Sequence, residues 1–151
     1  MIKYKASILI IINKQGKILL QDRAGISKIG EKWAVFGGGV ELGEKFYETL
    51  IREIKEELNI DLEDGKNNFR FICSQKFINT ARKNKVKCNY YALITDKEEK
   101  DFTVLEGAGC KYFSLEEARK NITIGDKQAN FMFFKGIEKT YNYYLQNYGE
   151  N

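Results

Sequence analysis

The sequence contains no histidine and no proline, and only three cysteines. Without histidine a zinc site is disfavoured and the usual general base is missing. Acid–base chemistry at neutral pH would therefore depend on carboxylates, lysine or metal-bound water. Cys73, Cys88 and Cys110 are odd in number and lack C-x-x-C spacing. We expect reduced thiols and a cytoplasmic location rather than a disulfide framework.

Long apolar runs are also lacking, because the longest one near the start, from Ala6 to Ile12, is too short to span a bilayer. It has no small-residue cleavage site after it, so we predict no signal peptide and no membrane partner. The 151 residues are 43% hydrophobic, which indicates one globular domain over residues 1–151. The net charge of +4 comes from scattered lysines and arginines, so the sequence disfavours a nucleic-acid partner.

A spaced pattern of glycine, arginine and glutamate runs from Gly38 to Ile60. Gly38 is followed by five residues and Glu44, then by seven residues and the sequence Arg-Glu-Ile-Lys-Glu-Glu at 52–57. Six demanding positions arise together by chance on the order of once in a hundred thousand sequences of this length. This pattern resembles the signature of the Nudix hydrolases, and Asn59 stands where that family has glycine.

Residues Lys45 to Leu58 contain neither proline nor glycine and predict a helix. Its expected core-facing stripe consists of Phe46, Tyr47, Leu50, Ile51, Ile54 and Leu58. Glu53, Glu56 and Glu57 share another strip, where three carboxylates repel each other unless Mg²⁺ or Mn²⁺ neutralises them. Glu57 borders the apolar stripe, so we expect it to be the most desolvated and to have a raised pKa.

The resemblance implies further roles around this helix. Glycines 37–39 would form a loop that approaches a ligand closely, and the Gly38 carbonyl would bind the metal. Arg52 could clamp a phosphate or act structurally. Its place four residues before Glu56 and eight after Glu44 favours the structural role, and by resemblance it would orient the neighbouring carboxylates. Glu106 stands six residues before an aromatic residue, which in this family marks a loop carboxylate that binds metal or acts as base. A solvated loop glutamate is the alternative.

Four other features are candidates for substrate binding. Arg23 would contact substrate phosphates or would simply be solvated. Asp126 predicts a helix N-cap, and by resemblance it could read the edge of a base. Trp33 would seal the core or stack on a base, and the core role is favoured. The basic connection from Asn79 to Lys85 predicts a substrate-facing loop.

The remaining pattern predicts an α/β fold. A hairpin is expected at 6–13 and 17–21, strands at 69–78 and 86–95, a short helix at the Ser114/Glu117 capping box, and a closing helix from Asp126. The aromatic stripe of the closing helix indicates core or a dimer surface, so monomer and homodimer remain open. The resemblance implies an α/β/α sandwich around a mixed β-sheet.

The predicted function is Mg²⁺-dependent hydrolysis of a diphosphate linked to a nucleoside, by attack of water at phosphorus. Two motifs of other substrate types, a proline about fifteen residues after the signature and a tyrosine at 75–77, are missing. Their absence favours a nucleoside triphosphate, including an oxidised purine nucleotide as in MutT-like enzymes. One alternative is a non-catalytic member of the fold that binds a nucleotide or another partner. Another is a basic RNA-binding protein, whose binding would fall steeply with salt.

Overall fold

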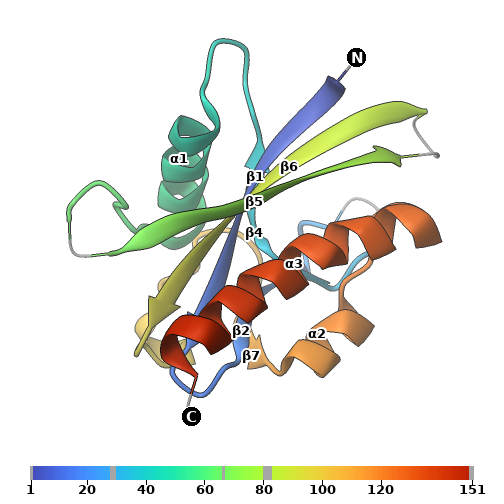
Figure 1. Cartoon of the computed structure of the whole chain (residues 1–151). Coiled ribbons are helices and arrows are strands. Elements are labelled where there is room, and N and C mark those ends of the chain that lie inside the picture. Colours follow the sequence, from blue (N-terminus) through green and yellow to red (C-terminus); the bar gives the residue numbers. More distant parts are fainter. Residues whose placement is uncertain (1, 28–29, 66, 80–82, 150–151) are drawn as a thin grey trace.

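The computed structural model describes residues 2–27, 30–65, 67–79 and 83–149 (Figure 1). The strands and helices occur along the chain in this order: β1 (Ile2–Asn13), β2 (Ile18–Asp22), β3 (Trp33–Ala34), β4 (Phe36–Gly39), α1 (Phe46–Leu58), β5 (Phe69–Asn79), β6 (Asn84–Thr95), the 3₁₀ helix η1 (Glu99–Asp101), β7 (Gly109–Phe113), α2 (Leu115–Asn121) and α3 (Lys127–Tyr148).

The described strands form one mixed sheet in the order β3-β2-β1-β6-β5, with β4 also paired to β1 and β7 to β2. Only the β1–β6 pair among them is parallel. The expected first hairpin is confirmed, with Ile12 opposite Ile18 and a turn closed by the Asn13 N–H, which donates to the Lys17 carbonyl at 2.9 Å.

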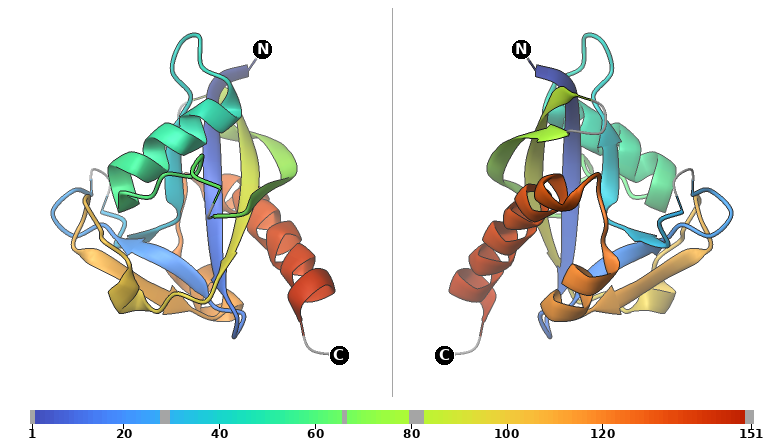
Figure 2. Two further views of the ribbon diagram at one scale, coloured as in Figure 1. Left: turned by 90° about the vertical axis from the view of Figure 1, so that its left-hand side faces the viewer. Right: turned by 90° about the vertical axis from the view of Figure 1, so that its right-hand side faces the viewer.

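Strand β1 is the centre of the core because both of its faces are buried. Ala6, Ile8, Ile10 and Ile12 face the layer that contains α3, whereas Leu9 and Ile11 face the layer that contains α1. Two views, each turned by 90° from that of Figure 1, show α1 on one face of the sheet and α2 with α3 on the other (Figure 2). The architecture is therefore α/β, and the predicted sandwich around a mixed sheet is confirmed.

Helix α1 buries most of the predicted stripe. Leu50, Ile54 and Leu58 are fully buried, but Tyr47 is 47% exposed, so its predicted core position is wrong. Thr49 is buried instead, and its hydroxyl donates to Glu44 Oε1 at 2.8 Å. Asn59 ends the helix in the left-handed conformation with φ 55°, which the substitution for glycine predicted.

The C-terminal helices begin where the caps predicted. Ser114 and Glu117 form a capping box at α2, and the Asp126 side chain accepts a hydrogen bond from the Ala129 N–H at the start of α3. Gly136 lies within α3 because the Tyr90 ring occupies the space that a Cβ would need. From the aromatic stripe, Phe134, Ile137 and Tyr144 are core, whereas Phe131, Leu145 and Tyr148 are about half exposed.

Several segments differ from the expected elements, and β3, β4 and η1 are among them. Strand β7 was not predicted, and β5 and β6 extend to Asn79 and from Asn84, so the connection between them is shorter than expected. Residues 80–82 of that predicted substrate-facing loop lie outside the described residues. No helix in the described part of the chain is long and apolar enough to cross a membrane.

Candidate active site

The three consecutive glycines lie in strand β4 and not in the loop that the sequence predicted. Gly38 pairs with Ser7 and Gly37 with Ile8 of β1. Gly37 has φ +133°, and a Cβ there would collide with the Ser7 carbonyl oxygen. A Cβ on Gly38 would collide with the Glu53 carboxylate. Because these glycines have no side chains, the main chain of β4 can pair with β1 and also lie close to α1.

Glu57 is a buried carboxylate that contacts this strand. Its side chain is directed toward β4, where Oε1 accepts a hydrogen bond from the Gly37 N–H at 2.9 Å, and the residue is 3% exposed. Burial raises the pKa of Glu57 to about 8, and the negative charges of Glu53 and Glu106 add to the shift. The hydrogen bond from Gly37 opposes this rise only in part. The expectation of a desolvated Glu57 with a raised pKa is borne out.

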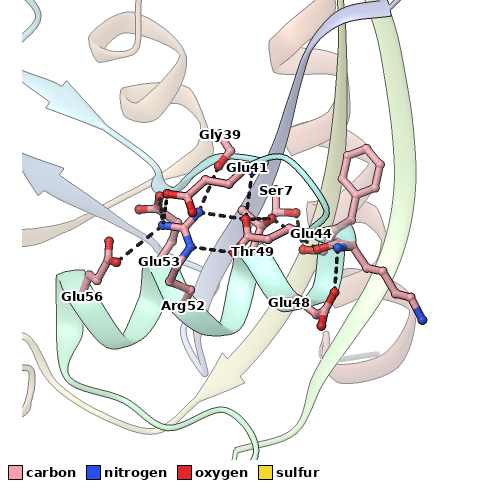
Figure 3. A network of polar contacts seen from close by, with 11 residues as sticks. Ser7, Gly39, Glu41, Glu44, Glu48, Thr49, Arg52, Glu53 and Glu56 are labelled. Carbon is pink, nitrogen blue, oxygen red and sulfur yellow. Dashed lines mark hydrogen bonds and ion pairs between the residues drawn. The ribbon is translucent and has the colours of Figure 1, made fainter.

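Arg52 links the other carboxylates of the motif (Figure 3). Its Nε and Nη2 donate to the two oxygens of Glu44, at 2.7 and 3.0 Å. Nη2 also donates to the Gly39 carbonyl at 3.1 Å, and Nη1 donates to Glu53 Oε1 at 2.9 Å. Glu56 Oε1 lies 3.5 Å from Nη1. This geometry supports the predicted structural role of Arg52, since one guanidinium fixes three carboxylates relative to β4.

The carboxylates of this network have pKa values shifted in opposite directions. The Arg52 hydrogen bond lowers the pKa of Glu44 to about 2, assisted by the Glu41 N–H and the Thr49 hydroxyl. The pKa of Arg52 is raised in turn, chiefly by Glu44. At Glu53, burial raises the pKa although Arg52 opposes the change. Glu44 is thus an ionised anchor, whereas the carboxyl nearer β4 is desolvated.

Glu106 lies on the loop before β7, next to the end of α1. The loop is held in place because the Leu105 N–H donates to the Glu57 carbonyl at 2.8 Å. Gln21 Nε2 donates to the Glu106 carbonyl at 2.9 Å. The charge of the Glu106 carboxylate contributes to the raised pKa values of both Glu53 and Glu57. The fold therefore brings this predicted residue to the motif helix, although its own side chain is exposed.

In the described part of the chain, no three acidic, histidine or cysteine side chains already converge as a metal-binding cluster. Arg52 contacts Glu53 and Glu56, and Gly37 contacts Glu57, so their oxygens are directed toward these donors. The donor set nevertheless suits a hard divalent cation, because it consists of carboxylates beside a side-chain-free backbone. A cation would also offset the charges of Glu53 and Glu106, which add to the rise in the pKa of Glu57 that burial causes.

A cavity of about 480 Å³ borders β4 and extends between the sheet and the start of α3. Its lining includes Gly37 and Gly38 as well as Arg23 and Trp33. Arg23 is not simply solvated, because its Nε donates to Glu31 Oε1 at 3.2 Å and its Nη1 to Gln21 Oε1 at 3.0 Å. Trp33 packs edge-on against Phe113 with ring centroids 4.8 Å apart, which confirms its core role.

Two buried oxygens near one end of this cavity have no hydrogen-bond partner among the described residues: Asn84 Oδ1 and Asp126 Oδ2. Asp126 uses only Oδ1 for its cap, at 2.8 Å from the Ala129 nitrogen. Asn84 lines the cavity, as does Gly125, the neighbour of Asp126. Sequence reasoning missed Asn84, because asparagine within an expected loop carries no signal that it starts a strand. The predicted site residues thus fall into two groups, the α1 carboxylates and the cavity residues, separated by β4.

Comparison with known proteins gives a consistent result. A family model described as the NUDIX domain matches residues 1–133. CTP pyrophosphohydrolase of Escherichia coli is 41% identical over 56 residues, which are 37% of this chain and 42% of that protein. The matched segment therefore spans less than half of this curated relative.

Solved structures resemble the fold over most of the chain. The dihydroneopterin triphosphate pyrophosphohydrolase of E. coli superposes with a TM-score of 0.67 at 16% identity, covering 94% of this chain and 99% of that one. An Ap4A hydrolase of C. elegans superposes with a TM-score of 0.63 at 21% identity, covering 91% and 97%. At these identities the likeness shows the shared fold.

Proposed function

Because this chain belongs to the Nudix family, we propose that it hydrolyses a diphosphate bond in a nucleoside triphosphate. The observation that carries the proposal is the buried Glu57 carboxylate. It is held by the Gly37 N–H at 2.9 Å, next to the charges of Glu53 and Glu106, and only the glycine strand separates it from a cavity. Buried carboxylates of raised pKa beside like charges are typical of catalytic sites.

We assign the metal-binding role to Glu53, Glu56, Glu57 and the Gly38 carbonyl, with Glu106 as a further carboxylate. The expected ion is Mg²⁺, and Mn²⁺ has the same preference for oxygen ligands. When bound, such an ion neutralises diphosphate charge and lowers the pKa of an attacking water. Glu53 and Glu56 would hold the ion in place of their contacts with Arg52, which is also anchored to Glu44.

A carboxylate of this group accepts the proton from the water that attacks phosphorus. Burial desolvates both Glu53 and Glu57, so these two carboxylates of α1 are the candidates for this role. Arg52 and Glu44 act by position, since the guanidinium fixes the carboxylates against the Gly39 carbonyl. The general base is therefore sought within α1 or at Glu106, because the chain has no histidine.

The cavity is proposed to hold the nucleoside. Arg23 at its edge is placed to contact phosphate, with Glu31 holding the guanidinium in position. The unpaired oxygens of Asn84 and Asp126 would accept hydrogen bonds from a base that presents N–H groups. A cytosine amino group and the N–H groups of an oxidised purine both meet this requirement. The match to CTP pyrophosphohydrolase places CTP in the substrate panel beside oxidised dGTP.

We further propose that residues 1–151 act as one domain on a small nucleotide in the cytoplasm. All three cysteines are unpaired, which fits a reducing compartment.

A substrate panel tests the activity directly. CTP, the common dNTPs, oxidised dGTP, ADP-ribose and diadenosine polyphosphates are assayed for phosphate products across a Mg²⁺ titration. We expect a nucleoside triphosphate to have the highest kcat/KM. Metal-dependent thermal stabilisation without product from any diphosphate would instead establish a non-catalytic nucleotide-binding protein.

The metal-binding assignment is tested by Glu53→Gln. This change removes a charge but keeps a similar shape, and we expect a large loss of Mg²⁺-dependent turnover with a weaker apparent metal affinity. Glu63→Gln is the matched control, because Glu63 is exposed on the loop after α1. Full Mg²⁺-dependent turnover by the Glu53 variant would overturn the assignment of that ligand.

A further inference from the structure

Charge is segregated in this fold in a way that the scattered sequence does not show. The segment from Phe69 to Thr95, which forms β5 and β6, contains six lysines and arginines and no aspartate or glutamate. Strand β1 (Ile2–Asn13) also contains no acidic residue. Because β6 pairs with both β1 and β5, these acid-free segments lie side by side (Figure 1). The fold thus gathers positive charge at one end of the sheet.

Three lysines stand directly opposite one another across these strands, and we call Lys5, Lys87 and Lys76 the lysine row. Lys5 pairs with Lys87 in the parallel β1–β6 ladder, and Lys87 pairs with Lys76 in the antiparallel β5–β6 ladder. Neighbouring strands are about 4.8 Å apart, so the row is about 10 Å wide. Lys85 stands two residues before Lys87 on the same face of β6.

The lysine row faces the α1 side of the sheet, next to the start of that helix. Lys87 Nζ lies 5.3 Å from the centroid of the Phe46 ring, which is the first residue of α1. Directly opposed residues share a face, so Lys5 and Lys76 point to the same side. Lys5 and Lys76 are exposed, and Phe46 and Lys87 are partly exposed. The surface therefore combines a row of cations with an accessible aromatic ring.

No carboxylate forms an ion pair with the lysine row anywhere in the described part of the chain. Two lysines elsewhere do have such a partner: Lys100 lies 3.7 Å from Glu98, and Lys120 lies 3.7 Å from Glu116. Like charges directly opposite on a sheet are destabilising. The row thus carries an unfavourable interaction that a polyanion would relieve.

We propose that the lysine row is a binding surface for single-stranded nucleic acid, separate from the nucleotide cavity. Successive phosphates of a single strand would neutralise the lysines, and an unstacked base would pack on the Phe46 ring. This combination of a basic track and an aromatic platform is how sequence-independent single-strand binding works. An acidic protein segment would satisfy the charges but would leave the ring unused.

Binding is measured by fluorescence anisotropy of labelled twelve-nucleotide oligouridine and oligothymidine with the intact chain, over a salt series. The test variant carries Lys5→Gln, Lys76→Gln and Lys87→Gln. The matched control carries Lys97→Gln, Lys100→Gln and Lys120→Gln, with the same loss of charge elsewhere. We expect the row variant to bind at least about tenfold more weakly at low salt. The slope of log K against log salt should fall by about 2, since each phosphate contact contributes roughly 0.7.

Three results would overturn this inference. One is wild-type binding that is undetectable at low salt, and another is equal affinity of the row and control variants. The third is preference for poly-glutamate or for vesicles rich in phosphatidylserine over the oligonucleotides. Replacement of Phe46 by leucine sharpens the assignment, since it should weaken oligonucleotide binding while poly-glutamate binding stays unchanged. Hydrolysis of a small nucleotide should be the same in the row and control variants, which separates this surface from the proposed active site.

Discussion

Glu44 and Glu57 are the same residue type on the same motif, yet their environments give them opposite properties. Glu44 accepts two hydrogen bonds from Arg52, and its pKa falls to about 2. Glu57 has one backbone N–H as partner and is buried, and its pKa rises to about 8. The first carboxylate is held as a permanent anion that positions Arg52. The second can exchange a proton near neutral pH in the metal-free protein, and it lies against Gly37 of β4.

The largest expected effect is on turnover by Glu57→Gln. Glutamine can still accept the Gly37 N–H, so the fold should be kept while the charge and proton acceptor are lost. We expect kcat/KM to fall roughly 10²–10⁴-fold at saturating Mg²⁺. Steady-state kinetics with Glu63→Gln as the control checks this result. Activity within tenfold of wild type would show that Glu57 is only structural.

The second prediction concerns the pH dependence of stability without metal. Between pH 4.5 and about 8 the folded protein keeps the Glu57 proton and the unfolded chain does not. Stability from this group is therefore complete below pH 4.5 and is lost as pH rises to about 8, by a few kcal/mol. Glu44 adds no slope in this window, because its lowered pKa acts below pH 4.5. Urea unfolding in EDTA at pH 5.5, 7 and 8.5 measures the decline.

Glu57→Gln is also the control for this decline, since it should flatten the profile and make the metal-free protein more stable at pH 8.5. Saturating Mg²⁺ should stabilise the wild type more at pH 8.5 than at pH 5.5. A wild-type profile as flat as that of the variant would contradict the assigned burial of Glu57.

Arg52→Gln tests the Glu44 side of the comparison, because Arg52 is the residue that holds Glu44 as an anion. The variant leaves Glu44, Glu53 and the Gly39 carbonyl without their common donor. We expect a stability loss of about 1–3 kcal/mol, less than for a fully buried ion pair because Arg52 is partly exposed. Chemical denaturation measures the loss. Arg52→Lys should recover little of it, because an ammonium cannot reproduce the two-oxygen contact with Glu44.

The smallest effect is expected at Asn59, which caps α1 at the Glu57 end. Its φ of 55° strains any residue with an ordinary side chain, so Asn59→Ala should cost about 1 kcal/mol. Asn59→Gly should be neutral or slightly stabilising. Thermal unfolding of both variants separates the backbone effect from loss of the amide. Equal destabilisation by glycine and alanine would indicate that the Asn59 side chain itself is needed.

The sequence predicted the parts of this molecule that depend on local spacing. Helical periodicity predicted the position of α1, and residue spacing predicted the contact between Arg52 and Glu44. Capping residues predicted where α2 and α3 begin. The family resemblance predicted that Glu106 would lie close to the motif helix. The α/β/α architecture followed from the order of the segments. These features need only the geometry of one helix or a known fold.

Features that depend on which strands become neighbours could not be predicted. The glycines of β4 were expected in a loop, because nothing local shows that β1 would accept them as a partner strand. Glu31 and Asn84 had no signal in the sequence, since their roles arise from contacts with Arg23 and with the cavity. The scattered lysines likewise became a row only through the registers of β1, β5 and β6. The pairing of strands that are distant in the sequence cannot be read from the local sequence pattern.

The glycine strand has one more implication, for how a substrate would reach both halves of the site. Gly37 and Gly38 leave only main chain between the cavity and the carboxylates of α1. Main chain that is paired to β1 cannot swing aside as a side chain can. Under the proposed function this boundary would stay fixed when substrates change, and discrimination between nucleotides would depend on cavity side chains such as Asn84.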